Sequence, residues 1–219
     1  MNVRLNLLKV RKYVDLMFKS NIKNMKILYP AIEFLSQHGC EKASLILGEY
    51  YRSSVLLDME GCEYSKRRYL IGSEKYRSPN IKKAEFYLTK SRQQGHVIAS
   101  YYLMDIYIEK CQYEKAYRCG LFVLPHLTKE MRGCCYHALG YMFYNFNKGK
   151  DAKKTAIDYW RKAVRCGNGT AAYEMGVAYM YGENVRRDLK LARKYFEKCI
   201  SFNNYCVANA KRRLRKLGV

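Results

Sequence analysis

The stretch AAYEMGVAYMYGENVRRDLKLARKYFEKC, residues 171–199, decides the fold because its pattern predicts one helical hairpin. Small and apolar residues recur there at i, i+3, i+4 and i+7, once on each side of a turn. Gly182 and Asn184 interrupt the pattern and predict that turn. Two short helices cannot bury both apolar faces alone, so the hairpin requires similar hairpins beside it. The first face consists of Ala172, Met175, Gly176 and Tyr179, and the second of Leu189, Ala192, Tyr195, Phe196 and Cys199.

A period of 36 residues links this hairpin to the one before it, since Gly140 precedes Gly176, and Trp160 precedes Phe196, by that spacing. A second register agrees, because nine residues separate Gly167 from Gly176. We expect glycine and alanine to let neighbouring helices approach while aromatic rings fill the wider spaces, so these are predicted packing positions. Other pairs 36 apart are Phe143 and Tyr179, Ala156 and Ala192, Tyr159 and Tyr195, Met104 and Gly140, and Tyr107 and Phe143; other pairs nine apart are Gly39 and Gly48, and Gly95 and Met104.

The predicted fold class is all-α, an α/α solenoid of about four to five helical hairpins in a single domain, residues 1–219. Only three prolines occur, which favours helices over strands. Pro30 falls inside an apolar pattern at 24–37, so that helix either kinks or starts there. The predicted segments are capping helices at 1–38, a first repeat at 39–95 with a long insertion at 52–79, a second repeat at 96–130, a third at 131–167, a fourth at 168–204 and a basic C-terminal capping helix at 205–219.

The net charge indicates which kind of partner the chain attracts, and the cysteine content indicates the redox state of its compartment. Forty-one Lys and Arg against nineteen Asp and Glu leave a net charge of +22, which attracts anionic partners unless the basic residues only solvate outer helix faces. Nine cysteines, an odd number that includes the adjacent Cys134 and Cys135, favour reduced thiols. No C-x-x-C pair or zinc-ligand spacing occurs, so we expect no metal site and no cofactor.

Hydropathy predicts neither a cleavable signal peptide nor a membrane span. Charged residues interrupt the apolar residues of the N-terminal MNVRLNLLKVRKYVDLMF, and nothing approaches the ~20 apolar residues of a spanning helix. We therefore expect a cytoplasmic protein, with export by a route without a cleavable signal left open. The moderately amphipathic pattern at 5–19 predicts a capping helix, with a basic helix that touches a membrane as the alternative.

The pattern A-x-x-M-G-x-x-Y-x-x-G-x-N-V-x-x-D-x-x-x-A-x-x-Y-F-x-K, from Ala172 to Lys198, resembles the Sel1-like repeat, a bacterially abundant relative of the tetratricopeptide repeat. The resemblance extends to 135–167, where NKGKDAKK replaces the usual inter-helix loop. It is weaker at 99–120 and weakest at 43–95. It implies a right-handed superhelix whose first helices line a concave surface, and a non-enzymatic role in holding partners together.

If first helices line the concave surface, the residues beside their packing stripe form the predicted partner-binding groove. Tyrosine gives a large contact area with a polar tip at low entropic cost, which suits an extended peptide or a helix. An alternative is that several of these tyrosines only pack against the next repeat. The groove consists of three sets 36 residues apart: Tyr101, His137 and Tyr173; Asp105, Tyr141 and Val177; and Ile108, Tyr144 and Met180.

A basic surface supports a second hypothesis, nucleic-acid binding along a basic groove with stacking aromatics. We expect residues 153–154 and 186–187 in loops and 193–194 on a second, convex helix. That placement favours an acidic protein, or non-specific binding, over a nucleic-acid groove. The surface consists of Lys153, Lys154, Arg186, Arg187, Arg193, Lys194, Arg212, Arg213, Arg215 and Lys216.

Catalysis needs a convergent nucleophile, base and acid. His137 beside Cys134 and Cys135 is the one cysteine–histidine neighbourhood, and on a helix these side chains point in different directions. We therefore expect a non-catalytic scaffold or adaptor that binds an acidic protein or peptide in the first-helix groove. A third hypothesis, from the resemblance alone, is a bacterial secreted effector or a toxin-immunity protein.

Overall fold

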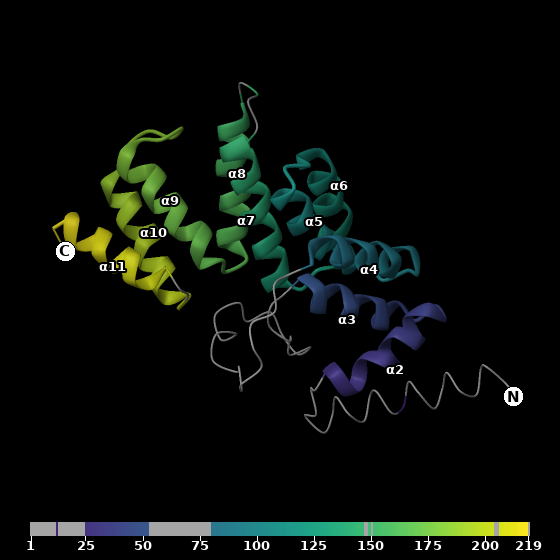
Figure 1. Ribbon diagram of the computed structural model, residues 1–219. Coiled ribbons are helices and arrows are strands. Elements are labelled where there is room, and N and C mark those ends of the chain that lie inside the picture. The colour runs from purple at the N-terminus through teal and green to yellow at the C-terminus, as the bar shows by residue number, and fades with distance from the viewer. Residues whose placement is uncertain are drawn as a thin grey trace, which may run out of the picture. The chain divides into compact units, whose positions relative to one another are not determined.

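The computed structural model describes residues 12, 25–52, 80–146, 149, 151–203 and 206–218. Within 25–52, side chains are described from residue 29 onward. The predicted capping helix at 5–19 and the predicted insertion at 52–79 lie outside these residues, apart from Lys12 and Arg52. All regular elements in the described ranges are helices, which confirms the all-α class (Figure 1). In chain order they are α2 Met25–Gln37, α3 Glu41–Arg52, α4 Ile81–Gln93, α5 Ala99–Glu109, α6 Tyr113–Val123, the 3-10 turn η1 Leu124–His126, α7 Lys129–Phe146, α8 Ala152–Arg165, α9 Gly169–Tyr181, α10 Leu189–Ser201 and α11 Val207–Lys216.

The chain divides into two compact units, and within the described residues the first ends at Tyr107 and the second begins at Ile108. Each is described by itself. In the first unit α3 pairs with α4, and α2 packs on α3. Gly48 makes the pairing close, because a Cβ on it would lie 2.5 Å from Cγ of the fully buried Leu88. The helices α3 and α4 therefore form a closely packed pair.

The second unit repeats one packing arrangement in two consecutive hairpins. Figure 1 shows α7 beside α8 and α9 beside α10, and α11 packs on α10. A Cβ on Gly140 would collide with the indole ring of Trp160, and a Cβ on Gly176 would lie 2.6 Å from Cε1 of Phe196. The same glycine–aromatic contact thus recurs 36 residues later, and the predicted packing role of these positions is confirmed.

Glycines with a left-handed backbone mark the turns between successive hairpins. Gly39, Gly95 and Gly167 have φ of +88°, +100° and +89°, which other L-residues rarely adopt. Asn203, which is 36 residues after Gly167, takes the same role before α11 with φ of +47°. Gly167 ends the hairpin α7–α8 and precedes α9, so the nine-residue register seen in the sequence reflects this turn.

One of the two alternatives for Pro30 is excluded, and the expected loop position of Lys153 and Lys154 is wrong. Pro30 lies inside α2, which starts at Met25, so the helix does not begin at the proline. Its ring is exposed, so the chain loses one backbone hydrogen bond without burying an unpaired group. Lys153 and Lys154 lie in the first turn of α8 and not in a loop. The helix begins early because the carbonyl of Asp151 accepts hydrogen bonds from both the backbone N–H of Thr155 (2.9 Å) and its hydroxyl (3.1 Å).

One histidine of α7 is held in its neutral form by the fold. His137 is half-buried, and burial lowers its pKa from the ordinary value of 6.5 to about 4 because the charged imidazolium loses hydration. Burial also lowers the pKa of His96 in the first unit. His126, in contrast, is exposed at the end of the 3-10 turn.

We predict that Gly176→Ala lowers the free energy of unfolding by about 1–3 kcal/mol, because the added Cβ meets the buried Phe196 ring. Urea unfolding measures the change. The same glycine substitution made in a Phe196→Leu background has a smaller cost, since the smaller side chain leaves room. An unchanged or higher stability, as alanine's greater helix propensity of ~1 kcal/mol alone would give, contradicts the contact.

We also predict that His137 makes the second unit sensitive to acid. Its folded pKa lies below its unfolded value, so its contribution is complete above pH ~6.5 and is lost as the pH falls toward ~4. Between pH 7 and pH 4, the free energy of unfolding should fall by about 1–3 kcal/mol less in the His137→Gln variant than in the wild-type protein. Urea unfolding at each pH measures this difference. Parallel pH profiles for the wild-type protein and the His137→Gln variant would contradict the assignment.

Candidate functional site

Exposed aromatic side chains gather at the end of α7. Tyr141 is 45% exposed and Phe146 is 39% exposed. Phe146 stacks on Tyr113 at the start of α6, with ring centroids 4.6 Å apart, and Tyr141 meets Phe146 edge-on at 5.9 Å. We call Tyr113, Tyr141 and Phe146 the aromatic patch. The sequence predicted Tyr141 as a contact residue but missed the other two.

Tyr144, which was also predicted to line the groove, packs and forms a hydrogen bond within the second unit. Its ring lies 5.1 Å from the ring of Trp160, and its hydroxyl donates to Oε2 of Glu183 at 2.6 Å. That hydrogen bond raises the pKa of Tyr144 to about 12, because the carboxylate stabilises the protonated hydroxyl. Nζ of Lys153 lies 5.4 Å from the centre of the same ring. Tyr144 therefore ties α7 to the loop between α9 and α10.

The predicted groove residues of α9, Tyr173, Val177 and Met180, are half-buried against the core of the second unit. Tyr173 lies 5.8 Å from Phe196 and accepts a hydrogen bond from Nε of Arg213 on α11 at 3.5 Å. The guanidinium of Arg213 also donates to the hydroxyl of Tyr181 at 2.5 Å. Tyr173 therefore packs within its own hairpin and against α11.

The predicted residues of α5 fall on both sides of the division between the units. Tyr101 is only 5% exposed, and Asp105 forms an ion pair with Arg52 at 3.7 Å; both belong to the first unit. The half-buried Ile108 belongs to the second unit, as does His137. The continuous nine-residue groove therefore stays a prediction.

Four residues of the predicted basic surface line one pocket in the second unit. Lys153 and Lys154 come from the first turn of α8, and Arg186 and Arg187 come from the loop between α9 and α10. The pocket has a volume of about 890 Å³ and lies between α8 of one hairpin and the turn of the next. We call it the basic pocket.

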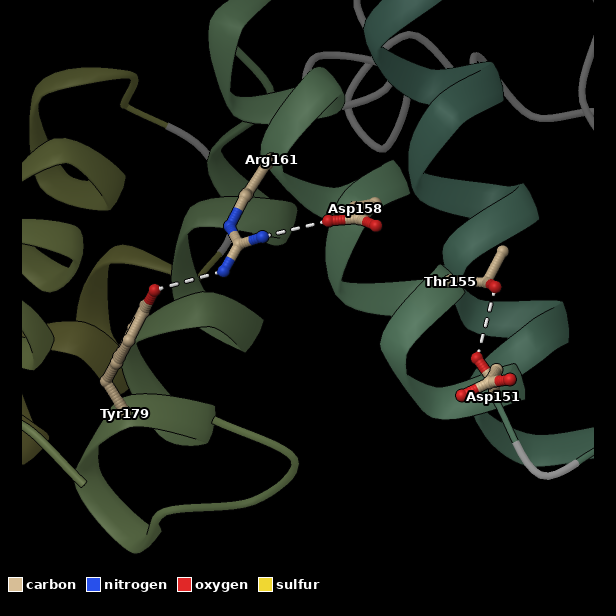
Figure 2. A network of polar contacts seen from close by, with 5 residues as sticks. All are labelled: Asp151, Thr155, Asp158, Arg161 and Tyr179. Carbon is tan, nitrogen blue, oxygen red and sulfur yellow. Dashed lines mark hydrogen bonds and ion pairs between the residues drawn. The ribbon is translucent and has the colours of Figure 1, made fainter. Parts of the chain in front are cut away.

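Arg161 and Lys190 add two further positive charges to the lining. Figure 2 shows the Arg161 guanidinium between Asp158 on its own helix, at 2.8 Å, and the hydroxyl of Tyr179 on α9, at 3.4 Å. The Tyr179 contact is the main cause of a raised pKa for Arg161, which stays charged. Figure 2 also shows the Asp151–Thr155 bond that closes the first turn of α8.

The sequence missed Arg161 and Lys190 although a signal for Arg161 was present. Lys154, Asp158 and Arg161 are spaced i, i+4 and i+7, so they share one face of α8. Lys190 lies in the first turn of α10, directly after the loop that carries Arg186 and Arg187. Joining these two segments requires knowledge of how successive hairpins pack.

The remaining predicted basic residues lie outside this pocket. Arg193 and Lys194 are exposed on α10, where Nε of Arg193 contacts Oε1 of Glu197 at 2.9 Å. On α11, Arg213 binds the two tyrosines described above. The other three, which are exposed, are Arg212, Arg215 and Lys216.

The cysteine–histidine neighbourhood of α7 does not converge. Cys135 is fully buried with its thiol directed to the carbonyl of Gly120 at 3.9 Å, whereas Cys134 lies 3.7 Å from Nδ2 of Asn168. No group of three His, Cys, Asp or Glu side chains in the described ranges is arranged to hold a metal ion. No helix among the described residues is long and apolar enough to cross a membrane.

A family model for the Sel1 repeat matches residues 63–96, 135–168 and 169–199. The last two matches correspond to the hairpins α7–α8 and α9–α10, whereas the predicted second repeat at 96–130 has no match. No curated protein matches the sequence.

Two similar solved structures share the fold. A Sel1 repeat protein from Oxalobacter formigenes is 22% identical with a TM-score of 0.59, over 83% of this chain and 47% of that one. The c5321 protein of uropathogenic Escherichia coli, described as a protective antigen with an SLR fold, is 21% identical with a TM-score of 0.56, over 79% and 33%. The chain thus spans a third to a half of the length of these proteins. Three segments of this chain thus match the Sel1 repeat, and the chain shares the solenoid fold of these proteins.

Proposed function

We propose that this chain is a non-catalytic scaffold that binds an acidic protein or peptide through the first-helix face of its second unit. Proteins with Sel1 repeats are generally protein-interaction scaffolds. The observation that carries the proposal is the aromatic patch, where the side chains of Tyr141 and Phe146 remain 45% and 39% exposed to solvent.

Exposed aromatic rings on a rigid helix suit a protein partner. Phe146 is held by its stack on Tyr113, and Tyr141 by its edge contact with Phe146, so little conformational entropy is lost on binding. Aromatic side chains of this kind dominate binding energy at protein interfaces. On the next hairpin, Tyr181 at the end of α9 is also exposed, at 52%.

The charge of the chain defines the chemistry of the partner. A net charge of +22 raises the encounter rate with an acidic protein, and this attraction weakens as salt screens it. The predicted groove residues Tyr144, Tyr173, Val177 and Met180 pack against the core of the second unit and so offer less area to a partner.

We predict that Tyr141→Ala combined with Phe146→Ala abolishes retention of a specific partner while the free energy of unfolding changes little. The measurement is affinity purification with mass spectrometry from the native source, with and without nuclease. Phe122→Ala is the matched control, because Phe122 is 54% exposed on α6, away from first-helix positions. A partner that survives the double substitution and is lost with Phe122→Ala would place the site elsewhere.

We further predict that generic RNA binds no more tightly than about 1 μM at physiological salt, the level expected of non-specific attraction to a basic protein. Fluorescence anisotropy across a salt series measures the affinity and its slope. Submicromolar binding that falls steeply with salt, together with partners that disappear on nuclease treatment, would overturn the protein scaffold in favour of a nucleic-acid-binding repeat protein.

A further inference from the structure

The basic pocket is a second candidate binding site in the second unit. Six basic side chains and two carboxylates line it, an excess of four positive charges around about 890 Å³. One carboxylate, Asp158, is bound to Arg161, and the other, Asp188, accepts the backbone N–H of Leu191 as the cap of α10 at 2.9 Å. Both acidic groups therefore have partners within the fold, and the excess positive charge faces the open space.

Three cations of the pocket have no partner of their own. Among the described residues, Lys154, Arg186 and Lys190 form no hydrogen bond or ion pair with another side chain, and all three are exposed. They come from α8, from the loop and from the start of α10, so they surround the space from different sides. A ligand with several negative charges would pair with them without displacing an existing contact.

The loop that carries Arg186 is fixed before any ligand arrives. The backbone N–H groups of Gly182 and Glu183 donate to the carbonyl of Ala178, and that of Asp188 donates to the carbonyl of Tyr179 at 3.0 Å. Glu183 is held by Tyr144, as described above, and Nε of Arg187 donates to the carbonyl of Met180 at 3.1 Å. A preorganised loop of this kind reduces the entropic cost of binding.

The pocket also has an apolar side. Leu189 is 43% exposed, and Val185 and the buried Ile157 line the same space. A simple inorganic anion would leave this surface and most of the volume unused. The lining therefore suits a ligand that combines several anionic groups with an aliphatic one.

The lining is poorly suited to single-stranded nucleic acid, which needs free aromatic faces on which bases stack. Tyr179 is the one aromatic residue that lines the pocket within the described residues. Its ring stacks on Tyr195 with centroids 5.5 Å apart and an interplanar angle of 10°, and its hydroxyl contacts Arg161. A peptide can carry both carboxylates and aliphatic side chains, which are the two kinds of group that this lining complements.

We propose that the basic pocket binds a short acidic peptide segment that carries an aliphatic side chain. Its carboxylates pair with Lys154, Arg186 and Lys190, and its aliphatic side chain packs on Leu189 and Val185. This inference rests on the proposed scaffold function and adds a second contact site for the same class of partner.

Three fluorescent peptides of equal length test the pocket with the full chain: alternating Glu and Leu, alternating Glu and Ser, and alternating Gln and Leu. The Glu–Leu peptide binds most tightly, and each of the others binds at least about tenfold more weakly. Lys154→Gln combined with Arg186→Gln weakens Glu–Leu binding at least about tenfold. The control, Arg215→Gln combined with Lys216→Gln on α11, removes the same charges at exposed positions and changes the affinity less than about twofold.

Equal loss in both double variants would show attraction by net charge alone and would overturn the pocket. No binding of the Glu–Leu peptide, equal binding of the Glu–Ser peptide, or tighter binding of oligouridine of equal charge that the pocket variant abolishes would also overturn it. Lys190→Gln with Lys154→Gln serves as a second pocket variant if the first alters the thermal unfolding midpoint. If the captured partner is lost in the aromatic-patch variant but kept in both pocket variants, the scaffold function stands and the pocket inference fails.

Discussion

The contact between a glycine of the first helix and an aromatic ring of the second is the constraint on which the second unit depends. At Gly140 and Gly176 the missing side chain gives the space that the rings of Trp160 and Phe196 occupy. Both rings are buried, with exposed fractions of 3% and 0%. The contact brings the two helices of each hairpin together, which sets where α8 and α10 present their outer residues. The site therefore follows from the packing.

The order of the helices was predictable because packing in a repeat leaves a periodic record in the sequence. The 36-residue spacing of Gly140 and Gly176 reported a contact that the structure shows twice, and Gly167 marked the turn between the hairpins. Boundaries were less predictable. Lys153 and Lys154 looked like loop residues because the sequence around them is polar, but the carbonyl of Asp151 already caps the first turn of α8. A local hydrogen bond of this kind has no periodic signature.

The site was only partly predictable, because exposure depends on neighbours that are distant in the chain. Tyr141 and Tyr144 are close in sequence and equivalent in type, yet one is exposed and the other is bound to Glu183 and Trp160. Phe146 was missed because its exposure depends on how it stacks on Tyr113 of α6. Likewise, the contact of Arg161 with Tyr179 joins α8 to α9, a helix of the next hairpin. The residue types of the site could be predicted from the sequence. Which of those residues are exposed depends on packing between the helices.

The aromatic patch and the basic pocket both lie in the second unit, and the central claim is that an acidic protein partner contacts both. Hydrogen–deuterium exchange of the chain with and without its captured partner tests this claim most directly. The account predicts slower exchange on binding at residues 141–146 and 182–190, with no change in α3 and α4 of the first unit. Protection confined to α3 and α4, or to the exposed face of α10, would contradict it.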